Sequence, residues 1–360
     1  MYFRSGSKFL KALTVMLTMG FSIAKTKGVL RLSSTNRFQM HIFAAPMNPA
    51  YFNSFFIQER INEVLSPAIS FFEPKEVEPT EDFAPCFILG PARSGSTMLY
   101  QHLSNRYRFS YIDNQIHLFH KNFRFGVKRS FNRFGHRPHQ SFGSNGGRTH
   151  EQGLHAPSEC GPFWYNYLAN GQRYFEGNEL SSQQIHAIRE NFYFLSKTFE
   201  APLLVKNLLL AERLKVLVKV FPKAKFIINF RKPEFCVQSM LLMRRSLGID
   251  EEASWSAIPK NYPDFADESL IPRLALQIHG LEKQILQDIP AENQSTIVHY
   301  EDLDEQLIVK LAGFITPLPE MREGADSPKV HAHQEQKVDN SEWKTIMESV
   351  EKLDWSHRNG

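Results

Sequence analysis

The segment from Gly90 to Thr97 combines glycines, hydroxyl side chains and one cation in the spacing of a phosphate-binding loop. It reads Gly-Pro-Ala-Arg-Ser-Gly-Ser-Thr, which fits the frame G-x-x-x-x-G-x-S/T. In such a loop, backbone N–H groups converge on an anion at a helix N-terminus. Ser96 stands where a nucleoside triphosphate loop needs a lysine to reach the outer phosphates. The segment is therefore expected to bind phosphate, but not as an ordinary ATPase loop.

A second cationic group follows a predicted buried strand at residues 225–230. This strand ends in Arg231-Lys232-Pro233, with no acidic residue to hold Mg²⁺, and Ser239 comes eight residues after Arg231. Ligands of open α/β sheets bind at this edge of the sheet. We expect Arg231 and Ser239 to grip a terminal phosphate monoester. Two phosphate subsites without Mg²⁺ indicate a nucleotide such as 3′-phosphoadenosine 5′-phosphosulfate (PAPS).

These segments require an alternation of strands and helices to position them. Apolar runs predict strands at 86–89, 109–112, 203–205, 225–230 and 296–300, and helical patterns predict helices at 55–65, 94–103, 182–199, 211–221, 234–245 and 274–286, with another after Asp302. Such alternation indicates a mostly parallel sheet covered on both faces. The expected fold is α/β, three layers with a central sheet flanked by helices, like that of P-loop proteins.

The predicted core does not span the whole chain. Residues 1–81 are expected to form an N-terminal extension with a short apolar run and a peripheral helix. The main domain is expected at 82–316, with a loop-rich insertion at 114–177, because that stretch shows no regular hydrophobic period. Residues 317–360 are expected to form a C-terminal loop and helix.

The loop and the second cationic group together resemble the motifs of the sulfotransferase family. The segment from Gly90 to Leu99 resembles its 5′-phosphosulfate loop, in the PRSGTT-L form. Residues 221–227, with Arg231, Pro233 and Ser239, are similar to its second motif, which binds the 3′-phosphate. Weaker landmarks of the same family are similar to Val205-Lys206-Asn207 and to Tyr300-Glu301-Asp302-Leu303. The resemblance covers roughly Ala84 to Phe314, and it departs from the family pattern at Lys232, where aspartate is usual, and at Ala92.

The resemblance implies PAPS as co-substrate, no required metal ion, and a role for each donor-site residue. Arg93 would neutralise the leaving 5′-phosphate and the transferring sulfuryl group. The backbone and hydroxyl groups of Ser94, Gly95, Ser96 and Thr97 would bind the 5′-phosphosulfate. Arg231 and Ser239 would bind the 3′-phosphate, and Lys206 is expected to line the site or to be merely solvated.

A hydroxyl acceptor needs a general base, and the sequence offers several candidates. Glu159 is the first choice, because a carboxylate among prolines and aromatic rings loses solvent, as functional carboxylates often do. Asp113, His150 and His155 compete with it.

The predicted insertion is basic and aromatic. Residues 114–150 contain no Asp or Glu and carry Lys121, Arg124, Lys128, Arg129, Arg133, Arg137 and Arg148. We expect an acceptor channel for a hydroxylated small molecule or a carbohydrate, or else a solvated loop with local packing. Nucleic acid is disfavoured as a partner, because the net charge of the whole chain is only +4.

The N-terminus carries an apolar run, Ala12 to Ala24, with basic residues on both sides. It is shorter than the ~20 apolar residues that span a bilayer. We expect a cytoplasmic protein, and the alternative is membrane association through residues 12–24. The three cysteines show no disulfide or metal-pair spacing, which fits a reducing compartment.

Two other functions compete with sulfuryl transfer. A P-loop kinase-like phosphotransferase would need Mg²⁺ and a loop lysine, and Ser96 speaks against it. A non-catalytic nucleotide-binding module would bind the same ligand without turnover. The sequence fixes neither the acceptor nor the oligomeric state.

Overall fold

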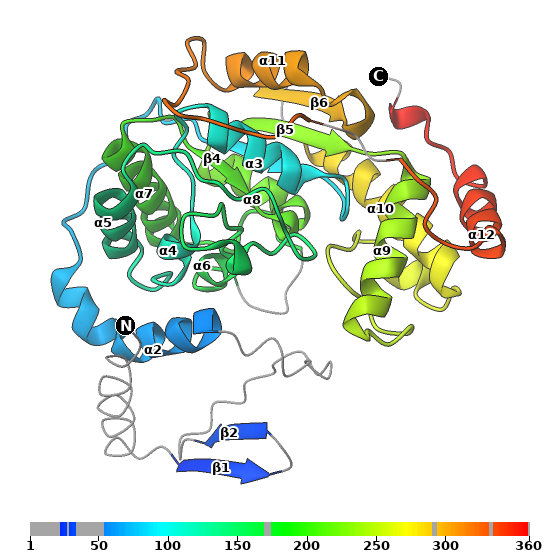
Figure 1. The fold of residues 1–360 in the computed structure, drawn as a ribbon, viewed down its shortest axis with the longest axis horizontal. Coiled ribbons are helices and arrows are strands. Elements are labelled where there is room, and N and C mark those ends of the chain that lie inside the picture. Colours follow the sequence, from blue (N-terminus) through cyan, green and yellow to red (C-terminus); the bar gives the residue numbers. More distant parts are fainter. Residues whose placement is uncertain are drawn as a thin grey trace. The chain divides into compact units, whose positions relative to one another are not determined.

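The computed structural model describes residues 22–26, 29–33, 54–168, 174–289, 294–330 and 334–358 (Figure 1). The chain divides into two units, residues 1–46 and 47–360. In the first, strands β1 (Ser22–Thr26) and β2 (Val29–Ser33) pair antiparallel. Most of the apolar run 12–24 lies outside the described residues. No described helix is both long enough and apolar enough to cross a membrane.

A four-stranded parallel sheet lies at the centre of the second unit. Its strands are β3 (Cys86–Leu89), β4 (Leu204–Lys206), β5 (Lys225–Phe230) and β6 (Ser295–His299), in the order β4-β3-β5-β6. Each is a short apolar run that follows a helical or loop segment, and the predicted strands are confirmed within one residue at these four places. The carboxyl ends of β3, β4 and β5 therefore meet at one edge of the sheet.

Alternate residues of the strands pack into two separate apolar clusters. Phe87 and Leu89 belong to one cluster, and Cys86 and Ile88 belong to the other. Side chains of α7 (Ser182–Phe199) and α8 (Leu214–Val220) fill the first, and those of α3 (Ser96–Arg106) and α11 (Glu305–Ile315) fill the second. The predicted three-layer α/β fold is therefore confirmed (Figure 1).

Three further helices pack together beside the sheet. They are α9 (Pro233–Leu247), α10 (Leu270–Asp288) and α12 (Asn340–Glu351), and their apolar side chains share a third cluster. Short 3-10 turns join the main elements: η2 (Ser70–Phe72), η3 (His150–Gln152), η4 (Leu208–Arg213), η5 (Tyr262–Phe265), η7 (Tyr300–Asp302) and η8 (Ser356–Arg358). The helix α9 follows β5 directly, so it starts at the same sheet edge as α3.

The structure differs from the sequence prediction at residues 109–112, which form no strand. Ser110 makes one isolated parallel bridge to Leu203. The guanidinium of Arg322 donates to the carbonyl oxygens of Tyr107 and Phe109. A buried cation thus takes the backbone acceptors that a neighbouring strand would otherwise use.

The stretch 114–177 contains helices as well as loops. These are α4 (Asn114–His117), α5 (Phe123–Phe134) and α6 (Gly161–Tyr165). The predicted peripheral helix is α2 (Ser54–Ile69), and it contacts this stretch through a bond from the Asn62 amide to the carbonyl oxygen of Leu118, 2.9 Å. Phe123, Val127 and Phe131 recur every four residues along α5 and pack toward α7, a helical period that the prediction of a loop-rich stretch overlooked.

Candidate active site

The phosphate loop connects β3 to α3 and needs glycine at two positions. A Cβ atom on Gly90, whose φ is +151°, would lie 2.2 Å from the carbonyl oxygen of Asn229. A Cβ atom on Gly95, whose φ is +89°, would lie 2.2 Å from the ring of Tyr300. Gly95 is also the N-cap of α3, which has eleven residues. Only glycine allows the loop to pass this close to β5 and to β6's end.

The loop is fastened to β5 by a side chain that sequence reasoning missed. The Asn229 amide donates to the carbonyl oxygen of Ser94, 2.6 Å away. Ser94 and Ser96 are buried at the start of α3, whereas Thr97 is half-buried. Within the described residues, the Ser94 hydroxyl is buried without a hydrogen-bond partner. A buried hydroxyl of this kind at a helix N-terminus suits a loop that binds an anion.

Arg93 joins the loop to the second predicted motif. Its Nε donates to Ser239 Oγ at 2.9 Å, and Ser239 lies on α9, 146 residues further along the chain. Arg93 has a positive φ of 66°, an unfavourable backbone conformation for a residue with a side chain. Burial lowers the pKa of the Arg93 guanidinium, and neighbouring Arg231 lowers it further. Two half-buried cations at one sheet edge make a site that favours anions.

Arg231 completes this cationic group. Its Nη1 donates to the Arg93 carbonyl oxygen at 3.3 Å, and its guanidinium lies 4.5 Å from the centre of the Tyr300 ring. Tyr300 thus supports both Arg231 and Gly95. Glu301, the next residue, accepts a bond from the Lys232 backbone N–H at 2.8 Å. The Tyr300-Glu301 pair holds the start of α9 against the end of β6.

A second group of side chains lies beside Thr97. Lys206, at the end of β4, donates to Thr97 Oγ1 at 3.1 Å and forms an ion pair with Glu159. Lys206 is only 3% exposed, and the side chain of Glu159 is 30% exposed. The structure therefore brings together Lys206 and Glu159, two residues that the sequence placed in the site on separate grounds.

Glu159 is held from the β4 side. Its Oε2 accepts from the Leu208 backbone N–H at 3.2 Å, and its carbonyl oxygen accepts from the Asn207 amide at 2.9 Å. Asn207 in turn caps η4 by accepting from Leu209 N–H. The carboxylate is therefore fixed in position, with one edge against protein and part of its surface exposed.

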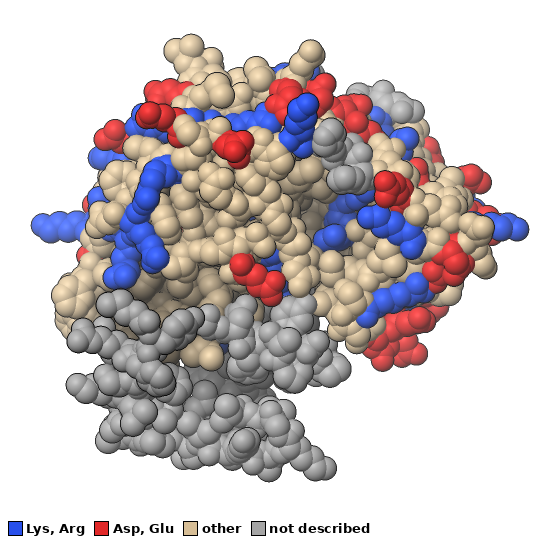
Figure 2. All heavy atoms as spheres, viewed as in Figure 1, with Lys and Arg blue, Asp and Glu red and all other residues tan. Residues whose placement is uncertain are grey.

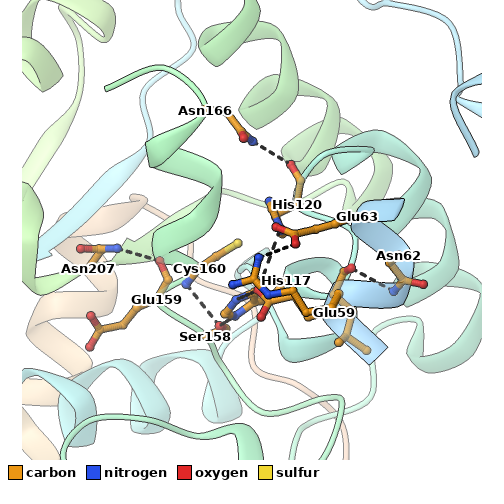
Figure 3. A network of polar contacts seen from close by, with 12 residues as sticks. Glu59, Asn62, Glu63, His117, His120, Ser158, Glu159, Cys160, Asn166 and Asn207 are labelled. Carbon is orange, nitrogen blue, oxygen red and sulfur yellow. Dashed lines mark hydrogen bonds and ion pairs between the residues drawn. The ribbon is translucent and has the colours of Figure 1, made fainter. Parts of the chain in front are cut away.

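A buried polar network holds the other side of Glu159 (Figure 3). Ser158 Oγ accepts from the Cys160 backbone N–H at 3.2 Å and bonds His117 Nδ1 at 2.8 Å. His117 Nε2 lies 3.1 Å from Glu59 Oε1 on α2. The chain of contacts runs from α2, through α4, to the two residues that flank Glu159. Sequence reasoning missed this network because its members lie 41 and 58 residues apart.

His120 extends the same network. Its Nε2 lies 3.2 Å from Glu63 Oε1, and the His120 carbonyl oxygen accepts from the Asn166 amide at 3.3 Å. Glu63 has a pKa lowered to about 2, because bonds to His120 and the charge of Arg60 outweigh the opposing effect of burial. The described residues contain no group of three or more His, Cys, Asp or Glu placed to hold a metal ion.

The three competitors for the base have other contacts. Asp113 caps α4 by accepting from Ile116 N–H, and it accepts from Ser130 Oγ at 2.6 Å. Burial raises the pKa of Asp113 to about 7. The rings of His150 and His155 stack on Phe55 and Phe134, each at 4.2 Å between centroids. Burial lowers the pKa of both histidines to about 3.

Most cations of the stretch 114–150 have protein partners. Arg124 forms a buried ion pair with Glu190, Arg129 lies over the rings of Phe119 and Phe125, and Lys128 lies over the ring of Phe194. Basic and acidic side chains are interspersed on the face shown in Figure 2. These contacts give the cations packing roles.

A surface pocket of about 460 Å³ lies away from these residues. It is lined by residues of α10, by Tyr174 to Glu176, and by Glu212, Lys215, Lys260 and Asn261. Glu176 pairs with both Lys215 and Lys260, so the pocket's charges neutralise one another. None of the predicted site residues lines it.

The chain matches a protein-family model over more than half of its length. The model of the sulfotransferase family matches residues 85–311, which is more than half of the chain. No curated protein matches. The phosphate loop, Lys206, Arg231, Ser239 and the Tyr300 support all lie inside the matched residues, whereas α2 lies outside them.

Three solved structures resemble the chain weakly. Sulfotransferase STF1 from Mycobacterium tuberculosis is 14% identical, with a TM-score of 0.41, over 72% of this chain and 74% of its own. Sulfotransferase STF9 from Mycobacterium avium is 14% identical, with a TM-score of 0.40, over 77% and 75%. A sulfotransferase from Alicyclobacillus acidocaldarius is 13% identical, with a TM-score of 0.35, over 77% and 99%. The match to the family model decides the assignment, and this chain belongs to the sulfotransferase family.

Proposed function

We propose that the protein transfers a sulfuryl group from PAPS to a hydroxyl or amine. One observation carries this proposal. The bond between Arg93 Nε and Ser239 Oγ, 2.9 Å long, joins the phosphate loop to the helix of the second motif. Two anion-binding elements from distant parts of the sequence therefore form one site, as a ligand with two separate phosphates requires.

The donor would be held by the following residues. The 5′-phosphosulfate lies on the backbone N–H groups of Ser94 to Thr97, at the positive end of α3. Arg93 supplies a cation to its phosphate, and Arg231 and Ser239 bind the 3′-phosphate. Arg231 stands where Mg²⁺-dependent phosphotransferases carry an acidic residue, and it supplies the compensating charge itself.

The reaction would proceed by in-line displacement. The acceptor oxygen or nitrogen forms a bond to sulfur while the bond from sulfur to the 5′-phosphate oxygen breaks, and the electron pair stays on that phosphate oxygen. Glu159 takes the acceptor proton. Lys206, which contacts both Thr97 and Glu159, offsets the negative charge on the transferring group. The products are adenosine 3′,5′-bisphosphate and the sulfated acceptor.

The contact between Glu159 and Lys206 favours an enzyme over a non-catalytic binding module. Binding of the bisphosphate alone needs no carboxylate near the transferring group, whereas transfer to a hydroxyl needs a group that accepts its proton. We propose a hydroxylated small molecule or a carbohydrate as acceptor, with Glu159 as the general base.

A transfer assay tests this function. The protein is incubated with PAPS and, in separate reactions, phenol, tyramine, glucose and cholesterol, and release of adenosine 3′,5′-bisphosphate is followed by chromatography. We expect acceptor-dependent release that Arg93→Ala reduces about 10²- to 10³-fold, the typical loss when a charge-stabilising donor is removed. Arg245→Ala, which changes an arginine on the far end of α9 that pairs with Glu342, is the matched control. Release that is equal in wild type and Arg93→Ala would contradict the proposal.

A further inference from the structure

A tight turn within the stretch 114–177 reaches the proposed reaction centre. It consists of residues 145–148, and Asn145 and Arg148 exchange two backbone hydrogen bonds of 2.9 and 3.0 Å. The two residues at its tip are glycines with positive φ, +61° at Gly146 and +90° at Gly147. Such angles are typical of the central positions of tight hairpin turns.

The two tip glycines face different surroundings. A Cβ atom on Gly147 would lie 3.4 Å from Glu159 Oε1, 3.5 Å from Thr97 Oγ1 and 3.9 Å from Lys206 Nζ. The three nearest atoms therefore belong to Thr97 of the phosphate loop and to Glu159 and Lys206, the two side chains proposed for the transfer step. A Cβ atom on Gly146 would instead lie 3.2 Å from Met243 Sδ on α9. Residue 147 faces the reaction centre, and residue 146 faces away from it.

The turn is anchored on both sides. Before it, the Gln101 amide of α3 donates to the Gly143 carbonyl oxygen at 3.0 Å. After it, Thr149 Oγ1 donates to the Pro157 carbonyl oxygen at 2.6 Å, and the Asn114 amide donates to the Thr149 carbonyl oxygen at 2.8 Å. These bonds connect the turn to the helix that begins at the phosphate loop and to the segment that carries Glu159. The position of Gly147 is therefore built into the fold.

We propose that Gly147 forms the acceptor-facing wall of the reaction centre and determines access of the acceptor to Glu159. This inference rests on the proposed function and adds a specificity-determining residue to it. An acceptor that gives its proton to Glu159 must approach within hydrogen-bond distance of Oε1 or Oε2. A side chain at position 147 would compete for the same space, since even its Cβ would be in van der Waals contact with Oε1. The absence of a side chain keeps that approach open.

The test compares Gly147→Ala with Gly146→Ala. Both changes place alanine at a positive φ in the same turn, so both carry backbone strain, but only the first adds an atom beside Glu159. Calorimetry with adenosine 3′,5′-bisphosphate measures donor-site affinity, and kcat/KM is measured with PAPS and the acceptor of highest turnover in the transfer assay. Gly147→Asn and Gly146→Asn form a second pair, because asparagine tolerates positive φ better than alanine does.

We expect Gly147→Ala to lower kcat/KM for the acceptor about 10²-fold, the scale of a misplaced reactant, with bisphosphate affinity within about twofold of wild type. Gly146→Ala should keep most of the turnover. Equal losses in the two variants, unchanged turnover in Gly147→Ala, or a matching loss of bisphosphate affinity would overturn the inference. A wild type that binds the bisphosphate but transfers to no acceptor would overturn the proposed function instead, so the two failures are distinguishable. If the alanine variants do not fold, the asparagine pair decides by the same criteria.

Discussion

The donor side and the acceptor side of the site are built in different ways. On the donor side, the loop 90–97 and the segment 231–239 each follow a strand and open a helix, so local sequence order places their polar groups. On the acceptor side, Gly147, Glu159 and Lys206 come from three separate segments and meet only through long-range contacts. Local backbone order therefore places most of the proposed donor groups, with added long-range bonds such as that between Arg93 and Ser239, whereas long-range contacts place the proposed acceptor groups.

The titratable groups of the two sides also differ. The proposed donor side holds two half-buried cations, Arg93 and Arg231, just before α3 and α9. The proposed acceptor side holds the buried Lys206, the buried pair of His117 and Glu59, and the half-buried stacked rings of His150 and His155. The first arrangement suits an anion, and the second fixes the position of Glu159. We therefore expect changes on the acceptor side to alter turnover and acid stability rather than donor affinity.

The substitution of Glu159 should have the largest effect, and it should change turnover without changing donor affinity. Glu159→Gln keeps the size of the side chain and its bond from Leu208 N–H, but it removes the proton acceptor. We expect kcat to fall about 10²- to 10⁴-fold, the usual range for loss of a general base. Bisphosphate affinity by calorimetry should stay within about threefold, well below the effect of one charge-assisted bond. Glu234→Gln, at the half-buried start of α9, serves as the control. A full retention of turnover in Glu159→Gln would show that another group accepts the proton.

A glycine substitution tests the backbone character of the donor site. Gly95→Ala places a methyl group against the Tyr300 ring, whereas Gly248, which has the same left-handed backbone conformation, has nothing within 4 Å of a Cβ atom. Overpacking should lower the free energy of unfolding of Gly95→Ala by about 1–3 kcal/mol more than that of Gly248→Ala. Bisphosphate affinity of Gly95→Ala should weaken roughly tenfold, because a displaced loop no longer directs its N–H groups at the anion. Equal behaviour of the two variants in denaturant titration and calorimetry would show that the loop tolerates a side chain.

A change in the buried network should affect stability on the acceptor side. Glu59→Ala removes the partner of His117 Nε2, whose side chain is 6% exposed. We expect the free energy of unfolding to fall by about 1–3 kcal/mol, the cost of a buried polar group left without its bond. Arg60→Ala, which changes the exposed neighbour on α2, should lower it by less than about 1 kcal/mol. The measurement is urea unfolding, and no difference between these variants would contradict the network's structural role.

Among these tests, acid pH should give the smallest change in stability, and this change should arise on the acceptor side. Burial, with Arg322 and Arg137 nearby, lowers the pKa of His155 to about 3 from an ordinary value of 6.5. The unfolded chain therefore binds a proton that the folded chain does not, and this stability contribution is lost as pH falls from 6.5 toward 3. His155→Phe keeps an aromatic ring against Phe134 and cannot be protonated. Its melting temperature should fall less than that of wild type between pH 7 and pH 5, and an identical fall in both would contradict the argument.

Much of the fold could be predicted from the sequence, because its strands are short apolar runs that alternate with helical patterns. The donor motifs were predictable for the same reason, since Gly90, Arg93 and Arg231 take their positions from local order. Residues 109–112 have an apolar strand pattern, but Arg322, more than 200 residues away, takes the carbonyl oxygen of Phe109. Sequence proximity gives no indication of such contacts.

Glu159 and Lys206 were predictable as single candidates, and their contact was not. Their pairing depends on the loop that follows Pro157 and on β4, which lie 47 residues apart. Gly147 had one signal, the pair of glycines in an Asn-Gly-Gly-Arg turn, which predicts a tight turn but not the side chains that it faces. Tyr300 lies in a segment similar to a family landmark, but its contacts with Arg231 and Gly95 had no local signal, and neither did Asn229 or the Glu59 to Ser158 network.

The central claim is that Arg93, Ser239 and Arg231 form one site for a nucleotide with two separate phosphates. It is tested most directly by calorimetry of adenosine 3′,5′-bisphosphate without Mg²⁺, with ATP and Mg²⁺ as the comparison ligand, on wild type, Arg231→Ala and the neighbouring exposed variant Lys232→Ala. We predict that wild type and Lys232→Ala bind the bisphosphate more tightly than ATP, and that Arg231→Ala loses roughly 10- to 100-fold in affinity, as expected for a charged hydrogen bond. Tighter binding of ATP with Mg²⁺, or equal bisphosphate affinity in Arg231→Ala and wild type, would contradict the account.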